Sequence, residues 1–591
     1  MKKHLTISIF NGGNMEIVFD IETNGLNPDK IHCIVIKELG KSPISYRPDT
    51  IENGIEKLQD ATVLIGHNIM GFDIPVINKL YNVDLFKDKI IIDTLVLSRL
   101  FEPTREGGHS LKNWGGILKC EKGEEPEDWE VFTEDMLAYC KQDVILNEKI
   151  HHYLNSESLG FSEESMVLEH DVFKIIKQQE DDGFLFNTKK ASILSSSLRE
   201  RMSIVQKEVR STFKPKWVDV KLVTPKLKKD GTLSKSGLTD YEYAEIKLTG
   251  DMKPFMRKKL QEFNLGSRKQ IGEYLKDFGW KPNNFTPTGQ PIVNESSLSK
   301  VKHIPEAKLI AEFLLLQKRI AQIDSWIKAV EKDDRIHGFV ISNGTITGRM
   351  THRSPNTGQV PNVRSEYGTE CRECWIVPED YKLVGIDASG LEIRMLAHYM
   401  NDEDYTNEII NGDIHSRNQQ IAGLQSRDQS KTFIYALMYG AGDSKLGSVV
   451  GGSKASGRQL RQQFFDNLPS FKNLRSRVEN AAKRTFLKGL DGRKIHIRNI
   501  HAALNSLLQG GGAIVMKKAL VILDKKARQA NIDYKFVANI HDEWQVEVKQ
   551  DQADQFGKLG VEAIKEAGKH FSMRCPLDGE YKIGDNWSET H

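Results

Sequence analysis

Residues 382–400 read KLVGIDASGLEIRMLAHYM, and this stretch decides the organisation of most of the 591-residue chain. The apolar run at 383–386 favours a β-strand that ends at Asp387. Glu392, Leu396 and Tyr399 then follow at helical spacing. The stretch therefore predicts a strand that presents a carboxylate at the edge of a sheet, with a helix directly after it.

A second stretch, residues 427–442, reads RDQSKTFIYALMYGAG and predicts a helix. Arg427, Lys431, Tyr435 and Tyr439 recur every four residues, so they lie along one helix face at intervals of about 6 Å. That face is cationic at one end and aromatic at the other, which is the polarity of a nucleoside triphosphate. A merely solvated helix face is the alternative interpretation.

A third stretch, residues 536–549, reads FVANIHDEWQVEVK and alternates apolar and polar side chains on either side of His541, Asp542 and Glu543. This pattern predicts a β-hairpin with acidic residues at its tip. Asp387 and Asp542, together with the carbonyl of Ala388, would hold a pair of Mg²⁺ ions. Such a pair can support the attack of a primer 3′-hydroxyl on an α-phosphate.

The N-terminal part carries a second set of acidic residues. Residues 15–26, MEIVFDIETNGL, predict a strand in which Asp20 and Glu22 share one face, because residues two apart in a strand point the same way. Residues 65–80, IGHNIMGFDIPVINKL, predict a strand followed by a helix with Asn68 and Asp73 near its start. Residues 137–150, LAYCKQDVILNEKI, predict a helix with Tyr139 and Asp143 on one face.

Four carboxylates gathered in one place repel one another unless cations lie between them. Two Mg²⁺ ions would remove that repulsion and support phosphodiester hydrolysis, with Tyr139 orienting the attacking water. Asp93, at another strand end in IIDTLVLSRL, is interpreted as structural. Unrelated surface acids are the alternative for the whole set.

These motifs carry a family resemblance. DxSxxExR from Asp387, RxxxKxxxYxxxYG from Arg427 and HDE from His541 resemble motifs A, B and C of family A DNA polymerases, the DNA polymerase I family. DIE, NxxxFD and YxxxD resemble the DnaQ-like 3′→5′ exonucleases. The match begins at Met15, covers nearly the whole chain, and is closer to the replicative polymerases of short-tailed, coliphage-like podoviruses than to the bacterial repair enzyme.

The resemblance implies a role for each matching position. Arg427 and Lys431 would bind the triphosphate, with His415 on its outer phosphates and Tyr439 completing the stripe. Tyr435 would stack behind the new base, and Glu392 would fill the space beside the ribose 2′ carbon. The DNA contacts would be Arg349, Gln509, His541 and, in the exonuclease, Asn68. The metal ligands would be Asp387, the carbonyl of Ala388, Asp542, Asp20, Glu22, Asp73 and Asp143.

The implied fold class is α/β plus α+β, a DnaQ or ribonuclease H-like exonuclease domain followed by a right-hand polymerase domain. The exonuclease is expected at 15–155 after an extension at 1–14 of uncertain role, since Met15 resembles a start of its own. The polymerase is expected at 156–591: thumb at 163–330, palm at 335–400 and 520–591, and fingers at 401–519.

Residues 214–259 hold 12 basic and 6 acidic residues, a local net charge of +6, with Gly and Pro between short alternating runs. This composition predicts a loop-rich insertion, at about 214–261, in the thumb. The resemblance offers host thioredoxin or another processivity factor as its partner. Direct contact with duplex phosphates is the alternative.

Composition adds exclusions rather than an identity. The chain is 39% hydrophobic and 28% charged, has a net charge of +2 and contains no apolar run of membrane length or signal-peptide core. Of the six cysteines only Cys371 and Cys374 form a CxxC, so reduced thiols are favoured over zinc. Composition therefore favours a cytosolic protein, and the resemblance implies a monomeric, phage-encoded protein that acts in the host cytoplasm.

The expected substrates are primer–template DNA and deoxynucleoside triphosphates. The expected cofactors are two Mg²⁺ at each site, with Mn²⁺ as a substitute, and a phage helicase–primase is a further partner. Two rival functions are a single-subunit RNA polymerase and a catalytically weakened DNA-binding relative. Glu392 and the exonuclease motifs argue against the first, and the complete set Asp387, Asp542, Arg427 and Lys431 argues against the second.

Overall fold

The structure is a computed structural model that describes residues 15–282, 284–298, 301 and 303–590, so the extension predicted at 1–14 lies outside the described residues. Contacts within the chain divide it into two compact units. The second unit is Thr188–Lys328, and the first consists of the chain before and after it.

The first unit begins with a five-stranded sheet in the order β3-β2-β1-β4-β5. β1 runs antiparallel to β2 and parallel to β4, so the sheet is mixed. The edge strands β3 and β5 join β2 antiparallel and β4 parallel. The strands are β1 (Glu16–Thr23), β2 (Ile31–Glu38), β3 (Ile44–Tyr46), β4 (Val63–Gly66) and β5 (Ile90–Asp93).

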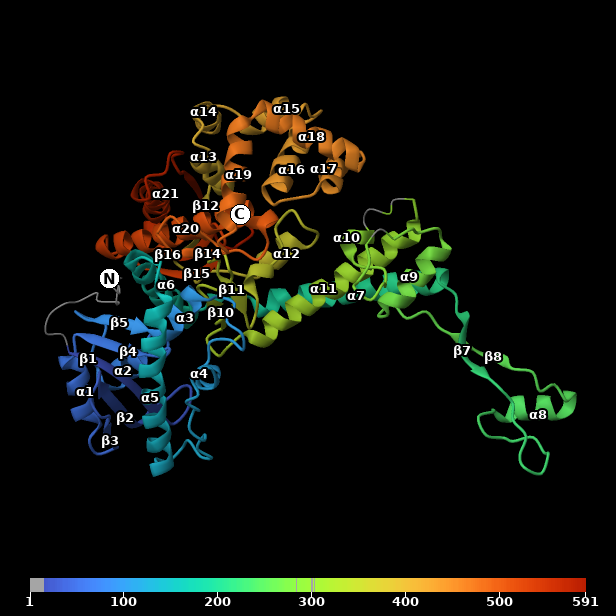
Figure 1. Cartoon of the computed structure of the whole chain (residues 1–591), viewed down its shortest axis with the longest axis horizontal. Helices are drawn as coiled ribbons and strands as arrows, with labels where there is room; N and C mark the ends of the chain where they lie inside the picture. The colour runs from blue at the N-terminus through green and yellow to red at the C-terminus, as the bar shows by residue number, and fades with distance from the viewer. Residues whose placement is uncertain (1–14, 283, 299–300, 302, 591) are drawn as a thin grey trace. The chain divides into compact units, whose positions relative to one another are not determined.

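Five helices accompany this sheet, which is drawn in blue in Figure 1: α1 (Ile51–Asp60), α2 (Asp73–Tyr81), α3 (Thr94–Phe101), α4 (Leu111–Leu118) and α5 (Glu134–Glu157). α5 packs against β1 and β2, because its Leu137, Cys140 and Val144 join Val18 and Val35 in one buried apolar cluster. α5 continues to Glu157, two residues past the exonuclease boundary predicted at 155.

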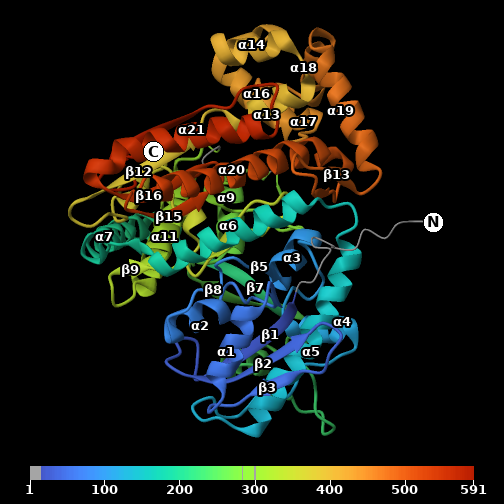
Figure 2. The same cartoon turned by 90° about the vertical axis from the view of Figure 1, so that its left-hand side faces the viewer.

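A four-stranded antiparallel sheet, β15-β16-β12-β17, forms the centre of the rest of this unit. Its strands are β12 (Tyr381–Ala388), β15 (Tyr534–Ile540), β16 (Glu543–Lys549) and β17 (Gly579–Gly584). α21 (Ala553–His570) packs on β12 and β17, and α6 (Glu163–Asp182) packs on β15. α20 (Ala503–Gln529) lies beside both helices, as Figure 2 shows.

Between β12 and α20 the chain forms a largely helical region. Its elements are α13 (Leu391–Met400), α14 (Glu403–Asn411), α15 (Ile414–Ala422), α16 (Arg427–Met438), α17 (Asp443–Val449), α18 (Lys454–Asn467), α19 (Pro469–Ala482), β13 (Phe486–Lys488), β14 (Lys494–His496) and η2 (Ile500–Ala502). The shorter elements elsewhere in the unit are β6 (Phe184–Leu185), β9 (Arg335–Ile336), β10 (Phe339–Ile341), β11 (Thr351–Arg353), η1 (Thr357–Gln359), α12 (Gly368–Arg372) and η3 (Gln550–Gln552).

α20 corrects one predicted boundary. The fingers were expected to end at residue 519, yet α20 is one continuous helix from Ala503 to Gln529. It is long and apolar enough to span a membrane, but 72% of the relevant window is buried inside the protein, as in a core helix. A side chain at Gly511 would meet Met395 Sδ at 3.0 Å, so the glycine lets α13 approach α20 closely.

The second unit contains α7 (Thr188–Thr212), β7 (Lys216–Val223), α8 (Asp240–Thr249), β8 (Phe255–Gln261), α9 (Arg268–Asp277), α10 (Glu295–Leu298) and α11 (Pro305–Ala329). It starts 25 residues after the thumb boundary predicted at 163, because α6 (Glu163–Asp182) packs in the first unit instead.

The basic insertion is not merely loops. β7 and β8 form a two-stranded antiparallel ribbon, with α8 between them. Gly and Pro lie in the connections, while the short alternating runs that were interpreted as loop pair with each other. We call residues 216–261 the basic ribbon.

Candidate active sites

Asp387 and Asp542 lie on neighbouring segments of the central sheet. Asp387 is the penultimate residue of β12, and Asp542 lies in the two-residue turn between β15 and β16, as the hairpin pattern predicted. The backbone N–H of Ala388 donates to the carbonyl of Asp542 at 3.1 Å, which fastens the two segments together. Strand β12 and the β15–β16 turn thus each deliver one carboxylate to the same place.

The electrostatic state of this pair favours a cation. Burial, followed by the charge of Asp542, raises the pKa of Asp387 to about 7. Burial also raises the pKa of Asp542. Neither carboxylate accepts a hydrogen bond from another side chain within the described part of the chain. Two desolvated acids without donors are suited to hold divalent cations, so the residues present fit a Mg²⁺ pair.

Glu543 is directed into the protein interior. One of its carboxylate oxygens accepts from Trp587 Nε1 at 2.9 Å and from Gln545 Nε2 at 2.6 Å. Glu543 is buried and stands opposite Asp387 in the β12–β16 register. It therefore supports the sheet beside the aspartates, and Trp587 connects the C-terminal GDNW stretch to that support.

A cleft opens beside Asp542, and predicted site residues from four separate segments line it. Arg349, Glu392, Gln509, His541 and Asp542 are all among its lining residues. Their segments are the loop after β10, the first turn of α13, α20 and the β15–β16 turn. The structure therefore brings these predicted site residues together.

Glu392 has partners that the sequence did not indicate. Arg349 Nη2 donates to Glu392 Oε1 at 2.9 Å, and the hydroxyl of Tyr439 donates to Oε2 at 2.5 Å. Each carboxylate oxygen of Glu392 thus accepts a hydrogen bond from a different segment, the loop after β10 or the end of α16. Tyr439, expected as the end of the triphosphate stripe, contacts Glu392 instead.

The predicted stripe on α16 has the expected polarity. Arg427 and Lys431 are exposed at its first turns, and Tyr435 is half-buried nearer its end. Glu392 and Asp542 both act on the Tyr435 hydroxyl, and together with burial, the largest cause, they raise its pKa. The aromatic end of α16 therefore faces the carboxylate end of the site.

The cationic end is more constrained than expected. Arg427 Nε donates to Asp413 Oδ2 at 2.8 Å, and its Nη2 donates to Oδ1 at 3.2 Å. Burial lowers the pKa of His415, and the nearby charges of Arg427 and Lys431 lower it further. Asp413, which also caps the start of α15, was missed because the sequence shows only another acidic N-cap.

The N-terminal carboxylates form one cluster, in which Glu22, Asp73 and Asp143 are buried and Asp20 is partly buried. Asp73 Oδ1 accepts from the backbone N–H of Ile21 at 3.1 Å, which brings α2 to the middle of the strand carrying Asp20 and Glu22. Asp143 is buried on α5, and its Oδ1 has no hydrogen-bond partner among the described residues. The four acids from β1, α2 and α5 are thus assembled as predicted.

Burial and neighbouring negative charges raise the pKa values of these four carboxyl groups. Burial is the largest cause of a raised pKa at all four, to about 9 for Glu22, about 7 for Asp73 and about 6 for Asp143. Burial, followed by the charge of Asp73, raises the pKa of Asp20 well above its usual range. Together with the unpartnered oxygen of Asp143, this cluster fits divalent cations.

Two residues near this cluster were not predicted. The Cys140 thiol donates to Asp20 Oδ2 at 3.5 Å, and Asp20, Glu22 and Cys140 form a group close enough to share an ion. The ammonium of Lys122 lies 3.3 Å from Asp143 Oδ2 and donates to the hydroxyl of Tyr139. Lys122 is the only basic residue in the acidic run 121–130, a signal that the sequence does contain.

Asp93 and Asn68 both belong to the structural frame. Asp93 is fully buried and accepts from the backbone N–H groups of Asn68, Met70, Leu95 and Val96, so it is structural as interpreted. Asn68 adopts φ +65°, and its amide side chain lies against Gly71. The side chain of Asn68 that is predicted to contact DNA therefore also has a structural role in this turn.

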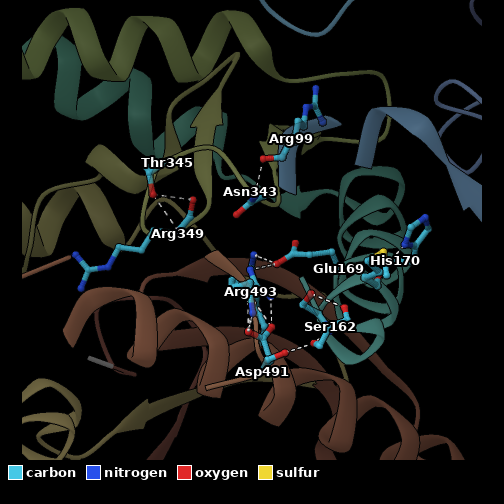
Figure 3. A network of polar contacts seen from close by, with 12 residues as sticks. Arg99, Ser162, Glu169, His170, Asn343, Thr345, Arg349, Asp491 and Arg493 are labelled. Carbon is cyan, nitrogen blue, oxygen red and sulfur yellow. Dashed lines mark hydrogen bonds and ion pairs between the residues drawn. The ribbon is translucent and has the colours of Figure 1, made fainter. Parts of the chain in front are cut away.

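The N-terminal sheet region is fastened to the rest of the first unit through α3. His170 Nε2 accepts from the backbone N–H of Asp93 at 2.9 Å. Asn343 Nδ2 donates to the carbonyl of Arg99 at 2.8 Å, a contact drawn in Figure 3. His496 Nε2 donates to the carbonyl of Phe101 at 2.8 Å. We call these three contacts the α3 junction.

A buried charge network lies next to that junction (Figure 3). Glu169 Oε1 on α6 accepts from Arg493 Nη1 at 2.5 Å and from Lys517 Nζ on α20 at 2.6 Å. Arg493 also forms an ion pair with Asp491 at 2.6 Å. At most 4% of each of these side chains is exposed, so all four charges depend on one another.

A pair of aspartates at one end of the central sheet, predicted DNA contacts lining the adjoining cleft, and a helix carrying cations and tyrosines are the features of a nucleotidyltransferase that copies a template. The sequence model described as DNA polymerase family A matches residues 246–589. The chain belongs to this family, and template-directed DNA synthesis is its activity.

Known proteins agree with that membership. The DNA-directed DNA polymerases of Enterobacteria phage T3 and Escherichia phage T7 are each 32% identical to the chain, covering 97% of it and all of the relative. A solved structure of the POL domain of Pol1 from M. smegmatis, in complex with DNA primer-template and dNTP, matches with a TM-score of 0.75 at 18% identity. That match covers 98% of this chain and 96% of the other, and it shows a shared fold.

Proposed function

We propose that the chain combines DNA synthesis with 3′→5′ exonucleolytic proofreading, at two sites that use separate carboxylates. The observation that carries the proposal is the cluster of partly buried Asp20 with buried Glu22, Asp73 and Asp143, which has Tyr139 beside it. Such a cluster is costly to keep in a fold unless it serves to bind cations. Asp387 and Asp542 lie on a different sheet.

At the synthesis site, Asp387, the carbonyl of Ala388 and Asp542 would hold two Mg²⁺ or Mn²⁺ ions. The bound ions would supply activation of the primer 3′-hydroxyl and charge stabilisation at the α-phosphate. Arg427, Lys431 and His415 bind the triphosphate, which requires Arg427 to release or share Asp413. Tyr435 stacks on the new base.

Template and primer occupy the cleft beside Asp542. Arg349 and Gln509 offer donors to the minor-groove acceptors that every correct base pair presents, so the contact is independent of sequence. His541 lies in the turn next to Asp542 and supports the primer terminus. Glu392, held by Arg349 and Tyr439, fills the space that a ribose 2′-hydroxyl would need.

At the exonuclease site, Asp20, Glu22, Asp73 and Asp143 would hold two further Mg²⁺ ions. The bound ions would supply an activated water and a stabilised leaving 3′-oxygen. Tyr139 orients the attacking water through its hydroxyl. Asn68, at the start of the α2 segment, is the candidate contact for the DNA strand.

The test separates the two activities. We expect Asp20→Ala with Glu22→Ala to abolish degradation of a single-stranded 3′ end and to leave primer extension intact. Asp387→Ala or Asp542→Ala should do the reverse. Glu52→Ala with Glu56→Ala, exposed residues of α1, is the matched control. Wild-type degradation by the first variant would refute the assignment of the exonuclease site.

We further propose that the chain replicates a phage genome in the cytoplasm of a bacterial host, with a helicase–primase as partner. The basic ribbon is the candidate docking site for thioredoxin or another processivity factor. Its exposed Trp217, Leu222 and Leu260, at 68%, 62% and 48% exposure, support a protein partner. Its exposed Lys221, Lys258 and Lys259 support contact with DNA phosphates.

The ribbon can be tested without distorting its unit, because Lys216 and Gln261 are paired and its ends are adjacent. Residues 217–260 are replaced by a short Gly-Ser turn, which should shorten products per binding event and spare single-nucleotide incorporation. Serine at the three lysines should flatten the salt dependence of DNA affinity. Serine at the three apolar positions should instead abolish lengthening by added thioredoxin. Unchanged product lengths in all three variants would refute a role in processivity.

A further inference from the structure

Lys122 brings a cation into the proposed exonuclease site from the loop between α4 and α5. Its Nζ lies 3.3 Å from Asp143 Oδ2, donates to the hydroxyl of Tyr139 and stands 4.4 Å from the centroid of the same ring. Only 24% of the Lys122 side chain is exposed. Removing an ammonium from water costs free energy. A lysine that is largely buried against two site residues is therefore held there by the surrounding fold.

The sequence around Lys122 makes this placement more selective. Residues 121–130 contain six acidic residues and one basic residue. Any of the neighbouring acids could have paired with Lys122 at the surface, yet its ammonium is directed at Asp143 and Tyr139. The loop is also packed on Tyr139, because a side chain at Gly123 would meet the tyrosine ring at 3.2 Å.

The contacts constrain both partners in a specific way. Lys122 can only donate, so the Tyr139 oxygen accepts from it, and the hydroxyl proton is left to donate elsewhere. On Asp143, Lys122 is at Oδ2, while Oδ1 is buried with no hydrogen-bond partner among the described residues. One ammonium thus sets the orientation of the hydroxyl and leaves one carboxylate oxygen available.

We propose that Lys122 is a positioning residue of the exonuclease reaction, which acts on the attacking water through the Tyr139 hydroxyl. The inference rests on the proposed exonuclease function. It assigns a role to a loop outside the carboxylate motifs, and no bond to substrate is made by Lys122 itself. Trp129, whose ring meets Tyr139 edge-on at 5.9 Å, closes the other side of the same arrangement.

The first test uses the full chain and three variants. Lys122→Met removes the charge and keeps the length, and Lys122→Arg keeps the charge. Lys141→Met, on the exposed side of α5, is the matched control. We expect Lys122→Met to lower kcat for degradation of a single-stranded oligonucleotide by about 100-fold, with KM within about 3-fold, because positioning errors act on the chemical step. Lys122→Arg should recover part of the loss.

A double-mutant cycle with Tyr139→Phe identifies the route of the effect. If Lys122 acts through the Tyr139 hydroxyl, adding Lys122→Met to the Tyr139→Phe variant should lower kcat by less than about a further 3-fold. Titration with Mn²⁺, followed by electron paramagnetic resonance, should show that Lys122→Met binds the ion at least as tightly as wild type.

Three outcomes would overturn the inference: Lys122→Met degrading DNA as fast as Lys141→Met, multiplicative losses in the double variant, or weakened Mn²⁺ binding that accounts for the loss. These are distinguishable from failure of the proposed function. In that case the wild-type chain itself would not degrade a 3′ end, or would still do so after Asp20→Ala with Glu22→Ala.

Discussion

Glu392 is held on both oxygens, by Arg349 from the loop after β10 and by Tyr439 from the end of α16. A carboxylate with two directed donors is a rigid obstacle rather than a mobile charge. The volume of the side chain, not its charge alone, should therefore discriminate between sugars.

We expect Glu392→Ala to raise incorporation of ribonucleotides relative to deoxyribonucleotides by about 10- to 100-fold, the range for changes of pocket volume. Glu392→Gln keeps the volume and should stay close to wild type. The measurement is steady-state kcat/KM for each nucleotide with one primer–template. Sugar discrimination in Glu392→Ala equal to that of Glu392→Gln would contradict the steric role.

The raised carboxyl pKa values predict how metal removal changes stability. Glu22, Asp73, Asp143 and Asp387 ionise in the unfolded chain near pH 4, but in the folded protein only near pH 9, 7, 6 and 7. The folded state thus binds more protons, so in EDTA the free energy of unfolding should fall as pH rises from about 4 towards 9. Mg²⁺ should cancel that fall.

Thermal melting from pH 5 to 9, with EDTA or Mg²⁺, checks this expectation. The gap in Tm between the two conditions should widen with pH and reach about 5 °C. Asp20→Ala with Glu22→Ala should narrow it, because the variant lacks two of the repelling groups. A gap that shrinks as pH rises would be inconsistent with cation-stabilised carboxylates.

At the residue scale, the sequence predicted the site residues that lie on regular helices and strands. Asp20, Glu22, Asp143 and the α16 stripe follow from strand and helix periodicity. Lys122, Asp413 and Cys140 were missed, since each acts through a partner distant in sequence. Spacing alone carries no information about such contacts.

Helix α6 shows the same limit at the scale of an element. Its Lys-, Glu- and Leu-rich sequence is typical of any packed helix, so it was grouped with the following helices. It is held in the first unit by Glu169, which is fully buried between Arg493 and Lys517, and by the buried apolar residues Leu168, Val172 and Ile176. A single buried charge with two distant partners cannot be recognised in a sequence.

We expect Glu169→Gln to lower the free energy of unfolding by about 3–5 kcal/mol, because it leaves the buried charge of Lys517 without a counter-ion. Glu169→Met with Lys517→Met removes both charges while Arg493 keeps Asp491, and should lose less. Urea unfolding followed by the helical circular dichroism signal provides the measurement. A double variant less stable than Glu169→Gln would show that the pair itself is net stabilising.

The basic ribbon was recognised by its charge but not by its structure. Strand pairing between residues about 40 apart depends on register, and Lys216 pairs with Gln261 across the whole insertion. The short alternating runs could therefore be recognised in the sequence, but their pairing with each other could not.

At the scale of the whole molecule, the α3 junction connects the two proposed active-site regions. Asn343→Leu with His496→Leu should remove both donors that reach α3. We expect faster proteolytic cleavage between the exonuclease and polymerase regions, with unchanged degradation of a free single strand. Arg99→Met is the control, since only the main chain of Arg99 takes part. Equal cleavage rates in the double variant and wild type would show that the α3 junction does not hold the two regions together.

Every atom that the N-terminal region contributes to that junction belongs to its main chain: the N–H of Asp93 and the carbonyls of Arg99 and Phe101. The last two are in the final turn of α3, where carbonyls have no partner within the helix. The polar contacts of the junction therefore do not depend on the side chains of α3, while its Val96 and Phe101 pack against Phe173 and Phe161 on the other side. An exonuclease module from a distant relative could be grafted onto this polymerase and bind in the same way, provided that its α3 follows the same backbone course and keeps apolar side chains at positions 96 and 101.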